Sequence, residues 1–137
     1  MTARVTINAN TTSTPYTVTI SDGQGHQWLA DEPAEVGGAD AGPSPGHLTL
    51  SSLGACTLIT LQMFAARKEW PLMGVAVELE LNPDGKPAAG GTVIRRNISL
   101  TGALNAEQQE RLLQVADACP MHKLLTGEVR IDTLLVP

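Results

Sequence analysis

Two cysteines, Cys56 and Cys119, are the side chains of this sequence best suited to covalent chemistry. Cys56 lies inside a predicted long helix beside Gly54 and Ala55, which leave space around its thiol. A thiol in the middle of a helix gains little from the helix dipole, so a reactive Cys56 thiolate would need a separate cationic partner. The alternative is that Cys56 is a small apolar core residue, as most buried cysteines are.

Cys119 has the more favourable local sequence, because it directly precedes Pro120. If Pro120 opens a short helix, Cys119 occupies its N-terminal cap, where free N–H groups and the positive end of the dipole favour a thiolate. His122 and Lys123 add positive charge nearby. The local sequence therefore predicts that Cys119 is the more acidic thiol. A helix-end cysteine packed against Leu124 is the alternative interpretation.

The three histidines point to weaker alternatives. His26, His47 and His122 follow no recognised spacing of metal ligands, either alone or with the cysteines. A Cys–His hydrolase would need a histidine close to its thiol, and His47 lies nine residues before Cys56. The sequence contains no Cys-x-x-Cys, no G-x-G-x-x-G and no P-loop. We therefore expect neither a metal site nor a hydrolase.

Strands and helices follow one another in an order typical of an α+β protein. Alternating apolar residues and turn residues predict strands near residues 5–7, 16–21, 27–31, 75–81, 92–101 and 129–133. Capping residues and prolines predict helices over residues 45–69, 106–118 and 120–126. Residues 33–45 are predicted to form a loop rich in Gly, Ala and Pro. Since no repeats are visible, residues 1–137 are predicted to form a single domain.

The helix predicted over residues 45–69 would position Cys56. Pro45 suits its first position after a Ser44 cap, and the helix must stop before Pro71. Its apolar residues lie on more than one face, which indicates a helix buried nearly all round. A lone subunit of 137 residues has trouble covering such a helix, so this pattern suggests a dimer. Residues 48–66 are uncharged and long enough to span a bilayer, but interspersed Ser, Thr and Gln favour burial in protein.

The charge balance argues against nucleic acid and anionic membranes as partners. The net charge is -5, and no basic cluster is longer than Arg95-Arg96 or Arg67-Lys68. A protein that binds nucleic acid is expected to present a basic face. Residues 1–5 lack the apolar run of a signal peptide, so we expect a cytoplasmic protein. In that compartment two cysteines indicate free thiols or a functional redox pair.

Three segments of the sequence carry a family resemblance. They are residues 42–45 with 48–57 around Cys56, residues 102–104 with 116–124 around Cys119, and the loop at residues 31–38. Together they resemble the OsmC/Ohr family of thiol-dependent peroxidases, and the OsmC-like branch more than the organic hydroperoxide resistance branch. Either cysteine motif alone would be weakly specific, whereas the pair in the same helical contexts is specific.

The resemblance implies a fold and a reaction. The fold is the OsmC-like one, with antiparallel sheets around two central helices, in an interlocked homodimer with active sites at the subunit interface. The Cys56 thiolate attacks a hydroperoxide and becomes a sulfenic acid, and Cys119 then condenses with it to form a disulfide. A dithiol of the lipoyl type reduces the pair. The resemblance implies no metal and no bound organic cofactor.

The sequence departs from the family at the groups that support the thiolate. Family peroxidases place a glutamate after the proline that opens the first helix, where this chain has Gly46 followed by His47. They also use an arginine of the N-terminal hairpin region, and this chain has no arginine between Arg4 and Arg67. A buried thiol without a cation keeps its proton and reacts slowly.

Arg96 is a candidate substitute, because its position in its strand places it on the apolar face. A buried arginine needs an anionic partner, which could be the Cys56 thiolate or an Asp or Glu in a structural ion pair. His47 could take the place of the glutamate, and His122 is a further supporting candidate. Two rivals to the peroxidase hypothesis stay open: a dimer that binds a small apolar ligand, and a redox sensor.

Overall fold

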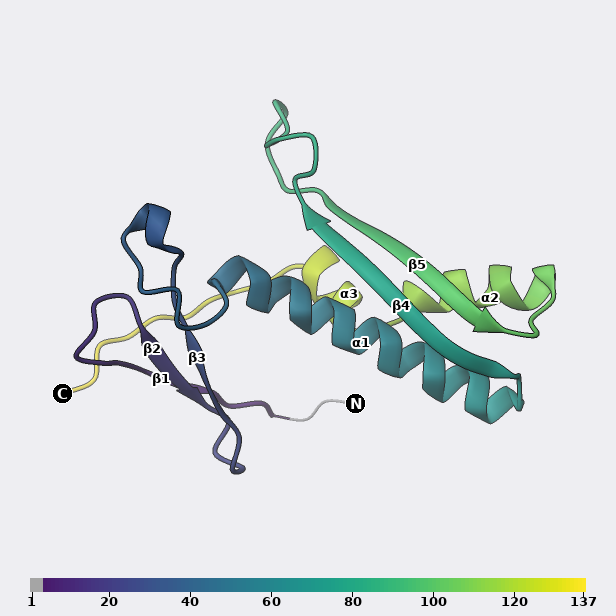
Figure 1. Ribbon diagram of the computed structural model, residues 1–137, viewed down its shortest axis with the longest axis horizontal. Helices are drawn as coiled ribbons and strands as arrows, with labels where there is room; N and C mark the ends of the chain where they lie inside the picture. The colour runs from purple at the N-terminus through teal and green to yellow at the C-terminus, as the bar shows by residue number, and fades with distance from the viewer. Residues whose placement is uncertain (1–3) are drawn as a thin grey trace. The chain divides into compact units, whose positions relative to one another are not determined.

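The computed structural model describes residues 4–137 (Figure 1). These residues fall into two compact units, which are described separately: the first ends at Thr49, and the second runs from Leu50 to Pro137. Helix α1 (Pro45–Lys68) begins in the first unit and continues into the second. The α+β class predicted from the sequence is confirmed, with antiparallel sheets and helices.

The first unit contains a three-stranded antiparallel sheet in the order β1 (Asn8–Thr11), β2 (Val18–Ser21) and β3 (Gln27–Ala30). The strand predicted near residues 5–7 is placed too early, because pairing starts at Asn8, opposite Ser21. The physical reason is that β2 ends at Ser21, where the Asp22 carboxylate accepts backbone N–H groups of the following turn. Residues before Asn8 therefore have no strand opposite them in this sheet.

A buried carboxylate, Asp31, organises the loop that follows β3. It accepts a hydrogen bond of 2.6 Å from the Thr17 hydroxyl and further bonds from backbone N–H groups of Glu32, Ala39 and Ala41. The Thr17 hydrogen bond, helped by these backbone groups, holds the pKa of Asp31 below its usual value against the opposing effect of burial. The 3₁₀ helix η1 (Ala34–Val36) lies within this loop.

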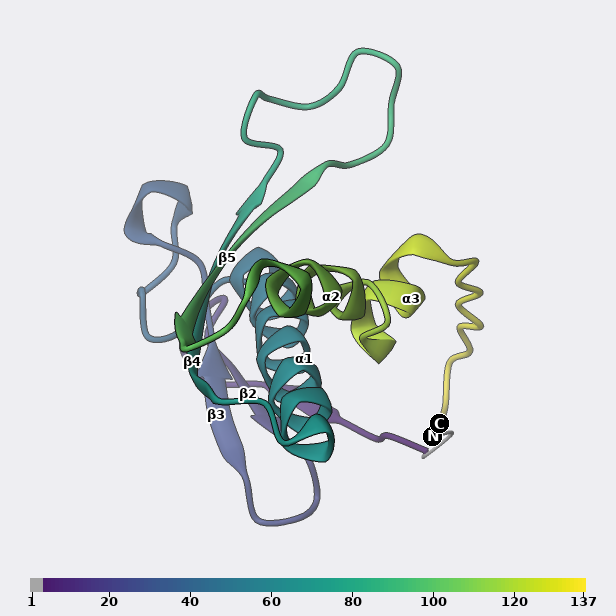
Figure 2. The same cartoon turned by 90° about the vertical axis from the view of Figure 1, so that its right-hand side faces the viewer.

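The second unit is built on a long hairpin of β4 (Leu72–Leu81) and β5 (Ile94–Gly102), which pair antiparallel. Its part of α1 and helix α2 (Ala106–Ala116) lie on the same face of this hairpin (Figure 2). Their buried core consists of Leu61 from α1 with three residues of α2, namely Leu112, Val115 and Ala116. Gly54 lets α1 approach β4 closely, since a Cβ at this position would lie 3.0 Å from Leu79 Cδ1.

The helix boundaries follow the capping residues seen in the sequence. Asn105 and Gln108 form a reciprocal capping box at the start of α2. Helix α2 ends at Ala116, two residues earlier than predicted, and Cys119 then caps the short helix α3 (Pro120–Thr126). Pro120 is its first residue, as predicted.

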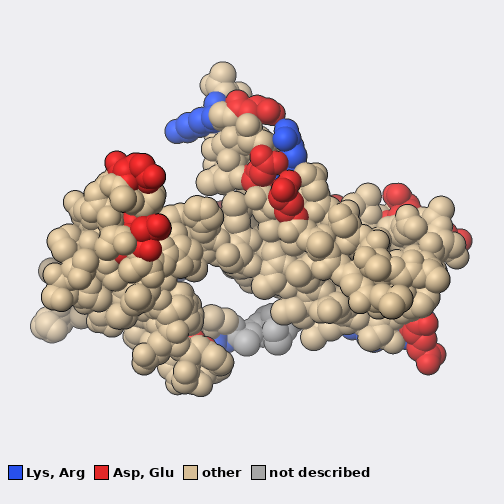
Figure 3. All heavy atoms as spheres, in the orientation of Figure 1, with Lys and Arg blue, Asp and Glu red and all other residues tan. Residues whose placement is uncertain are grey.

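The end of the β4–β5 hairpin carries charged side chains of both signs (Figure 3). Arg95 lies 3.2 Å from the Asp84 carboxylate and 4.0 Å from that of Glu80, and all three side chains are exposed. Arg96, the next residue, points to the opposite face because side chains alternate along a strand. Its side chain is only 11% exposed, so two neighbouring arginines have entirely different surroundings.

One predicted strand is wrong, and the burial of α1 in the single chain is incomplete. The strand predicted at residues 129–133 is absent: residues 127–137 have no regular structure, because a strand needs a ladder partner and none of the described strands pairs with them. Helix α1 is not covered on every face by the single chain, since Ile59 and Met63 are 51% and 60% exposed, which agrees with the expectation that one subunit has trouble covering it. By length and composition α1 could cross a membrane, a test that core helices of soluble proteins also pass.

Candidate active site

The structure brings the two cysteines together. Cys56, on α1, and Cys119, at the N-cap of α3, are both free thiols, and they lie close enough for Cys56 to raise the pKa of Cys119. Cys119 is fully buried, whereas Cys56 is half-buried. The Cys56 sulfur also lies 4.0 Å from the Thr60 hydroxyl. The two thiols named from the sequence are therefore neighbours in the second unit, both in the free form.

The surroundings of Cys119 reverse the prediction about its acidity. The cap itself is as expected, since the His122 N–H donates to the Cys119 sulfur at 3.3 Å. Burial nevertheless raises the pKa of the Cys119 thiol above its ordinary value of 9.0, and the Cys56 thiol raises it further. The backbone N–H groups of His122 and Met121 act in the opposite direction but do not outweigh these two effects. The prediction that Cys119 is an acidic thiol is therefore wrong, because burial opposes the charged form.

Arg96 lies on the inner face of β5, as its strand parity predicted. Its Nη1 donates to the Thr57 hydroxyl at 3.0 Å, and its Nη2 donates to an Asp117 carboxylate oxygen at 3.0 Å. Its anionic partner is thus Asp117, and no hydrogen bond from Arg96 reaches Cys56 within residues 4–137. Of the two anionic partners considered for Arg96, the Cys56 thiolate and an acidic side chain, the structure contains the acidic side chain.

His122 is the third side chain at this guanidinium. Its Nδ1 lies 3.1 Å from Arg96 Nη2, and because arginine can only donate, Nδ1 is the acceptor. The same Nδ1 lies 3.7 Å from the Asp117 carboxylate, so the three side chains form one cluster. Asp117 and Thr57 were not singled out in the sequence, although each stands within two residues of a cysteine. A buried arginine facing a short cysteine segment was the signal that could have pointed to Asp117.

His47 belongs to the first turn of α1. It is exposed, its Nδ1 lies 2.6 Å from the Ser44 hydroxyl, and its backbone N–H donates to the same oxygen. Ser44 thus caps the helix, as predicted. Nine residues separate His47 from Cys56 in one continuous helix, which is about two and a half turns and hence the opposite face. This spacing does not suit a Cys–His pair.

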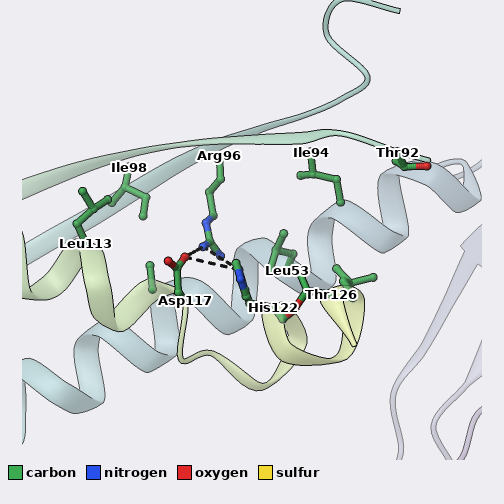
Figure 4. Close-up of a pocket in the computed structure, with 11 residues that line it drawn as sticks. Leu53, Thr92, Ile94, Arg96, Ile98, Leu113, Asp117, His122 and Thr126 are labelled. Atoms are coloured by element: carbon green, nitrogen blue, oxygen red, sulfur yellow. Dashed lines mark hydrogen bonds and ion pairs between the residues drawn. The ribbon is translucent and has the colours of Figure 1, made fainter. Parts of the chain in front are cut away.

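A cavity of about 340 Å³ lies beside Arg96 in the second unit (Figure 4). One wall is polar, with Arg96, Asp117 and His122 joined by hydrogen bonds. The other walls are largely apolar and include Leu53, Ile94, Ile98, Leu113 and Leu125. Its lining, as described, includes neither cysteine. Within residues 4–137 no three His, Cys, Asp or Glu side chains gather as metal ligands would.

Residues 37–134 of the chain match the family described as OsmC-like protein. The chain belongs to this family. The match includes both cysteine segments and Arg96, and it begins within the loop that follows β3. A comparison with curated proteins gives no match.

Solved structures agree on the fold. An OsmC-like protein from Mycoplasma pneumoniae superposes with a TM-score of 0.76 at 20% identity, over 93% of this chain and 90% of that one. An organic hydroperoxide resistance protein OsmC from Legionella pneumophila gives 0.66 at 22% identity, over 91% and 90%. An organic hydroperoxide resistance protein from Elizabethkingia anophelis gives 0.65 at 15% identity, over 93% and 91%. At these identities the likeness shows the OsmC-like fold alone.

Proposed function

We propose that this OsmC-like protein is a thiol-dependent peroxidase that reduces hydroperoxides with Cys56 as the nucleophile and Cys119 as the resolving thiol. The observation that carries the proposal is the proximity of the two thiols, one half-buried and one fully buried. Two solved relatives are named organic hydroperoxide resistance proteins, which supports the same substrate class.

The difference in exposure supports the proposed order of the steps. A peroxide from solvent can approach Cys56, which is half-buried, but not Cys119, which has no exposed surface. Cys119 also keeps its proton at neutral pH because burial raises its pKa, whereas the attacking species must be a thiolate. The resemblance assigns first attack to Cys56, and the geometry supports the same assignment.

The proposed cycle has three steps. The Cys56 thiolate attacks a peroxide oxygen and breaks the O–O bond, and the alkoxide that leaves takes up a proton to become an alcohol, while Cys56 becomes a sulfenic acid. The Cys119 sulfur then attacks the Cys56 sulfur, and water leaves with the sulfenic oxygen and the thiol proton. An external dithiol, of the lipoyl type in family members, reduces the disulfide to two thiols and becomes a disulfide itself.

The test is stopped-flow oxidation of the reduced protein by cumene hydroperoxide and by hydrogen peroxide, with mass mapping of the products. Wild type should form a Cys56–Cys119 disulfide, and Cys119→Ser should accumulate a Cys56 sulfenic acid that dimedone traps. Cys56→Ser should react no faster than free cysteine. Oxidation at the rate of free cysteine in all three proteins would refute the proposal.

We also propose that the protein works as an interlocked homodimer in the cytoplasm, with residues 1–137 as one domain. The support is the apolar surface that the single chain leaves exposed, on α1 at Ile59 and Met63 and in the tail at Ile131 and Leu135. Contiguous exposed apolar surface of this kind is typical of protein–protein interfaces. Sedimentation of the purified protein should give twice the mass of 14.4 kDa, and Met63→Glu should lower the fraction of dimer. A monomer at micromolar concentration would exclude the dimer.

A second candidate function rests on the cavity beside Arg96. Its apolar walls and single polar wall suit a small apolar ligand with one hydrogen-bonding group. Cumyl alcohol, the product of cumene hydroperoxide reduction, is a suitable probe. NMR titration should shift the methyl signals of Ile94 and Leu125, and Ile98→Trp should abolish binding while Met73→Trp, at a position 82% exposed, should not. Titration without shifts would exclude this function.

A further inference from the structure

Arg96 contacts both of the segments that carry a cysteine. Its Nη1 donates to Thr57, the residue that follows Cys56 on α1. Its Nη2 donates to Asp117 and to His122, which stand on either side of Cys119 in the sequence. A single guanidinium therefore joins the helix of one thiol to the connection and helix of the other. We refer to Arg96 with Thr57, Asp117 and His122 as the Arg96 clamp.

We propose that Arg96 is a positioning residue that holds the two cysteine segments in place for disulfide formation. It acts through its neighbours and does not touch either sulfur. The inference rests on the proposed function only for the identity of the oxidant, because any oxidant that forms the Cys56–Cys119 disulfide requires the same approach of the two sulfurs.

The contacts at Thr57 are well suited to fixing the position of α1. Thr57 is fully buried, and its hydroxyl donates to the Leu53 carbonyl at 2.7 Å. Since that proton is committed to the helix backbone, the oxygen is oriented to accept from Arg96 at 3.0 Å. Loss of the guanidinium would leave this buried oxygen without its tertiary donor.

The contacts at the other end fix the start of α3. His122 accepts from Arg96 through its ring, and its backbone N–H donates to the Cys119 sulfur at 3.3 Å. Arg96 thus reaches Cys119 through one intervening residue. A short helix of seven residues has few hydrogen bonds of its own, so external contacts such as these set its position.

The planar fork of arginine is needed for this arrangement. Two nitrogens of one rigid group donate in different directions, to α1 and to the α2–α3 connection. A lysine would keep the charge, but its three donors sit on one nitrogen at the end of a flexible stem, so it cannot reproduce the fixed, divergent geometry of the two guanidinium nitrogens. Arg96→Lys is therefore the informative variant, and Arg95→Lys on the exposed face of the same strand is its matched control.

The test measures how strongly the fold favours the disulfide, without any peroxide. Reduced protein is equilibrated anaerobically with reduced and oxidised glutathione, and the fractions of dithiol, mixed disulfide and intramolecular disulfide are determined by mass spectrometry. Oxidised glutathione accepts the two electrons: two protein thiols become one disulfide, and two molecules of reduced glutathione are released. The equilibrium gives the effective concentration of Cys119 at Cys56.

Arg96→Lys should lower that effective concentration by about 10- to 100-fold, because a small misplacement of reacting groups has an effect of this size. Arg95→Lys should leave it unchanged. Asp117→Ala, at a side chain 68% exposed, should give a smaller decrease and still fold, so the proposal can be tested even if Arg96→Lys unfolds. A lower melting temperature with an unchanged effective concentration would show a merely structural role and overturn the proposal.

A second experiment distinguishes the positioning role of Arg96 from the peroxidase proposal. With cumene hydroperoxide, Arg96→Lys should form the Cys56 sulfenic acid at nearly the wild-type rate but resolve it slowly, so that dimedone traps more of it. If wild type forms no sulfenic acid, the peroxidase proposal fails while the glutathione equilibrium still tests Arg96. If Arg96→Lys matches Arg95→Lys in both experiments, Arg96 has no positioning role.

Discussion

The two cysteines of this protein lie side by side in opposite kinds of surroundings. Cys119 has the local features that favour a thiolate, namely a helix N-cap and a proline at the first helical position, but it is fully buried. Cys56 lies within a long helix, where the backbone offers its sulfur no free N–H group, yet it is half-buried and therefore open to a reactant. Burial raises the pKa of Cys119 in spite of its cap.

The comparison shows that access and desolvation outweigh local backbone geometry in assigning roles to two thiols. A capping N–H at 3.3 Å from sulfur contributes one weak hydrogen bond, whereas complete removal from water penalises the anion strongly. A buried thiol that keeps its proton is well suited to the proposed resolving step, in which it meets the electrophilic sulfur of the neighbouring Cys56.

The largest expected effect is the difference in hydroperoxide turnover between the two cysteine variants. Cys56→Ser should reduce hydroperoxide turnover to the background rate, while Cys119→Ser should keep one rapid reaction per active site and then stop. The reason is that Cys119 enters only after the sulfenic acid has formed. Single-turnover kinetics with cumene hydroperoxide checks this difference. If Cys119→Ser lost the first reaction and Cys56→Ser kept it, the two roles would have to be exchanged.

The next effect concerns pH. The folded state holds the Cys119 proton more tightly than the unfolded chain, whose thiol has the ordinary pKa of 9.0. Below that pH both states carry the proton and stability is unaffected; as pH rises past 9.0 the unfolded state ionises first, so the free energy of unfolding must fall. Urea unfolding of Cys56→Ser and of the double variant Cys56→Ser/Cys119→Ser at several pH values measures this loss of stability. The Cys56→Ser background is suitable because burial, the main cause of the raised Cys119 pKa, remains when Cys56 is removed.

The double variant lacks the buried thiol and should show a smaller decrease in stability above pH 9.0. The ultraviolet absorbance of the thiolate gives the same pKa without a reagent that must reach the buried sulfur: in folded Cys56→Ser it should rise with a pH midpoint above 9.0. A midpoint below neutrality would restore Cys119 as the acidic thiol and break the comparison.

The features that the sequence predicted well are those determined by neighbouring residues. Pro45 and Pro71 delimit α1, Asn105 and Gln108 begin α2, and alternation places Arg96 on the inner face of β5. These depend on backbone geometry over a few residues, so local patterns predict them.

The features that it predicted poorly depend on residues distant in the sequence. The acidity of Cys119 depends on what buries it, and the partner of Arg96 depends on how the α2–α3 connection packs against β5. The strand expected at residues 129–133 has the right alternation but no paired strand in the described chain. Alternation predicts only that a segment could form a strand, and a ladder partner decides whether it does.

The smallest expected effect compares two threonines on the Cys56 side. Thr57 is fully buried and bonded to Arg96, whereas Thr60 is only half-buried and lies 4.0 Å from the Cys56 sulfur. Thr57→Val should lower the free energy of unfolding by about 1–3 kcal/mol, because it leaves a buried arginine donor without its acceptor. Thr60→Val should change it by less than about 0.5 kcal/mol. Chemical denaturation of both variants measures the difference. Equal effects would mean that the bond between Arg96 and Thr57 adds nothing to stability, and the α1 end of the Arg96 clamp would then lose its support.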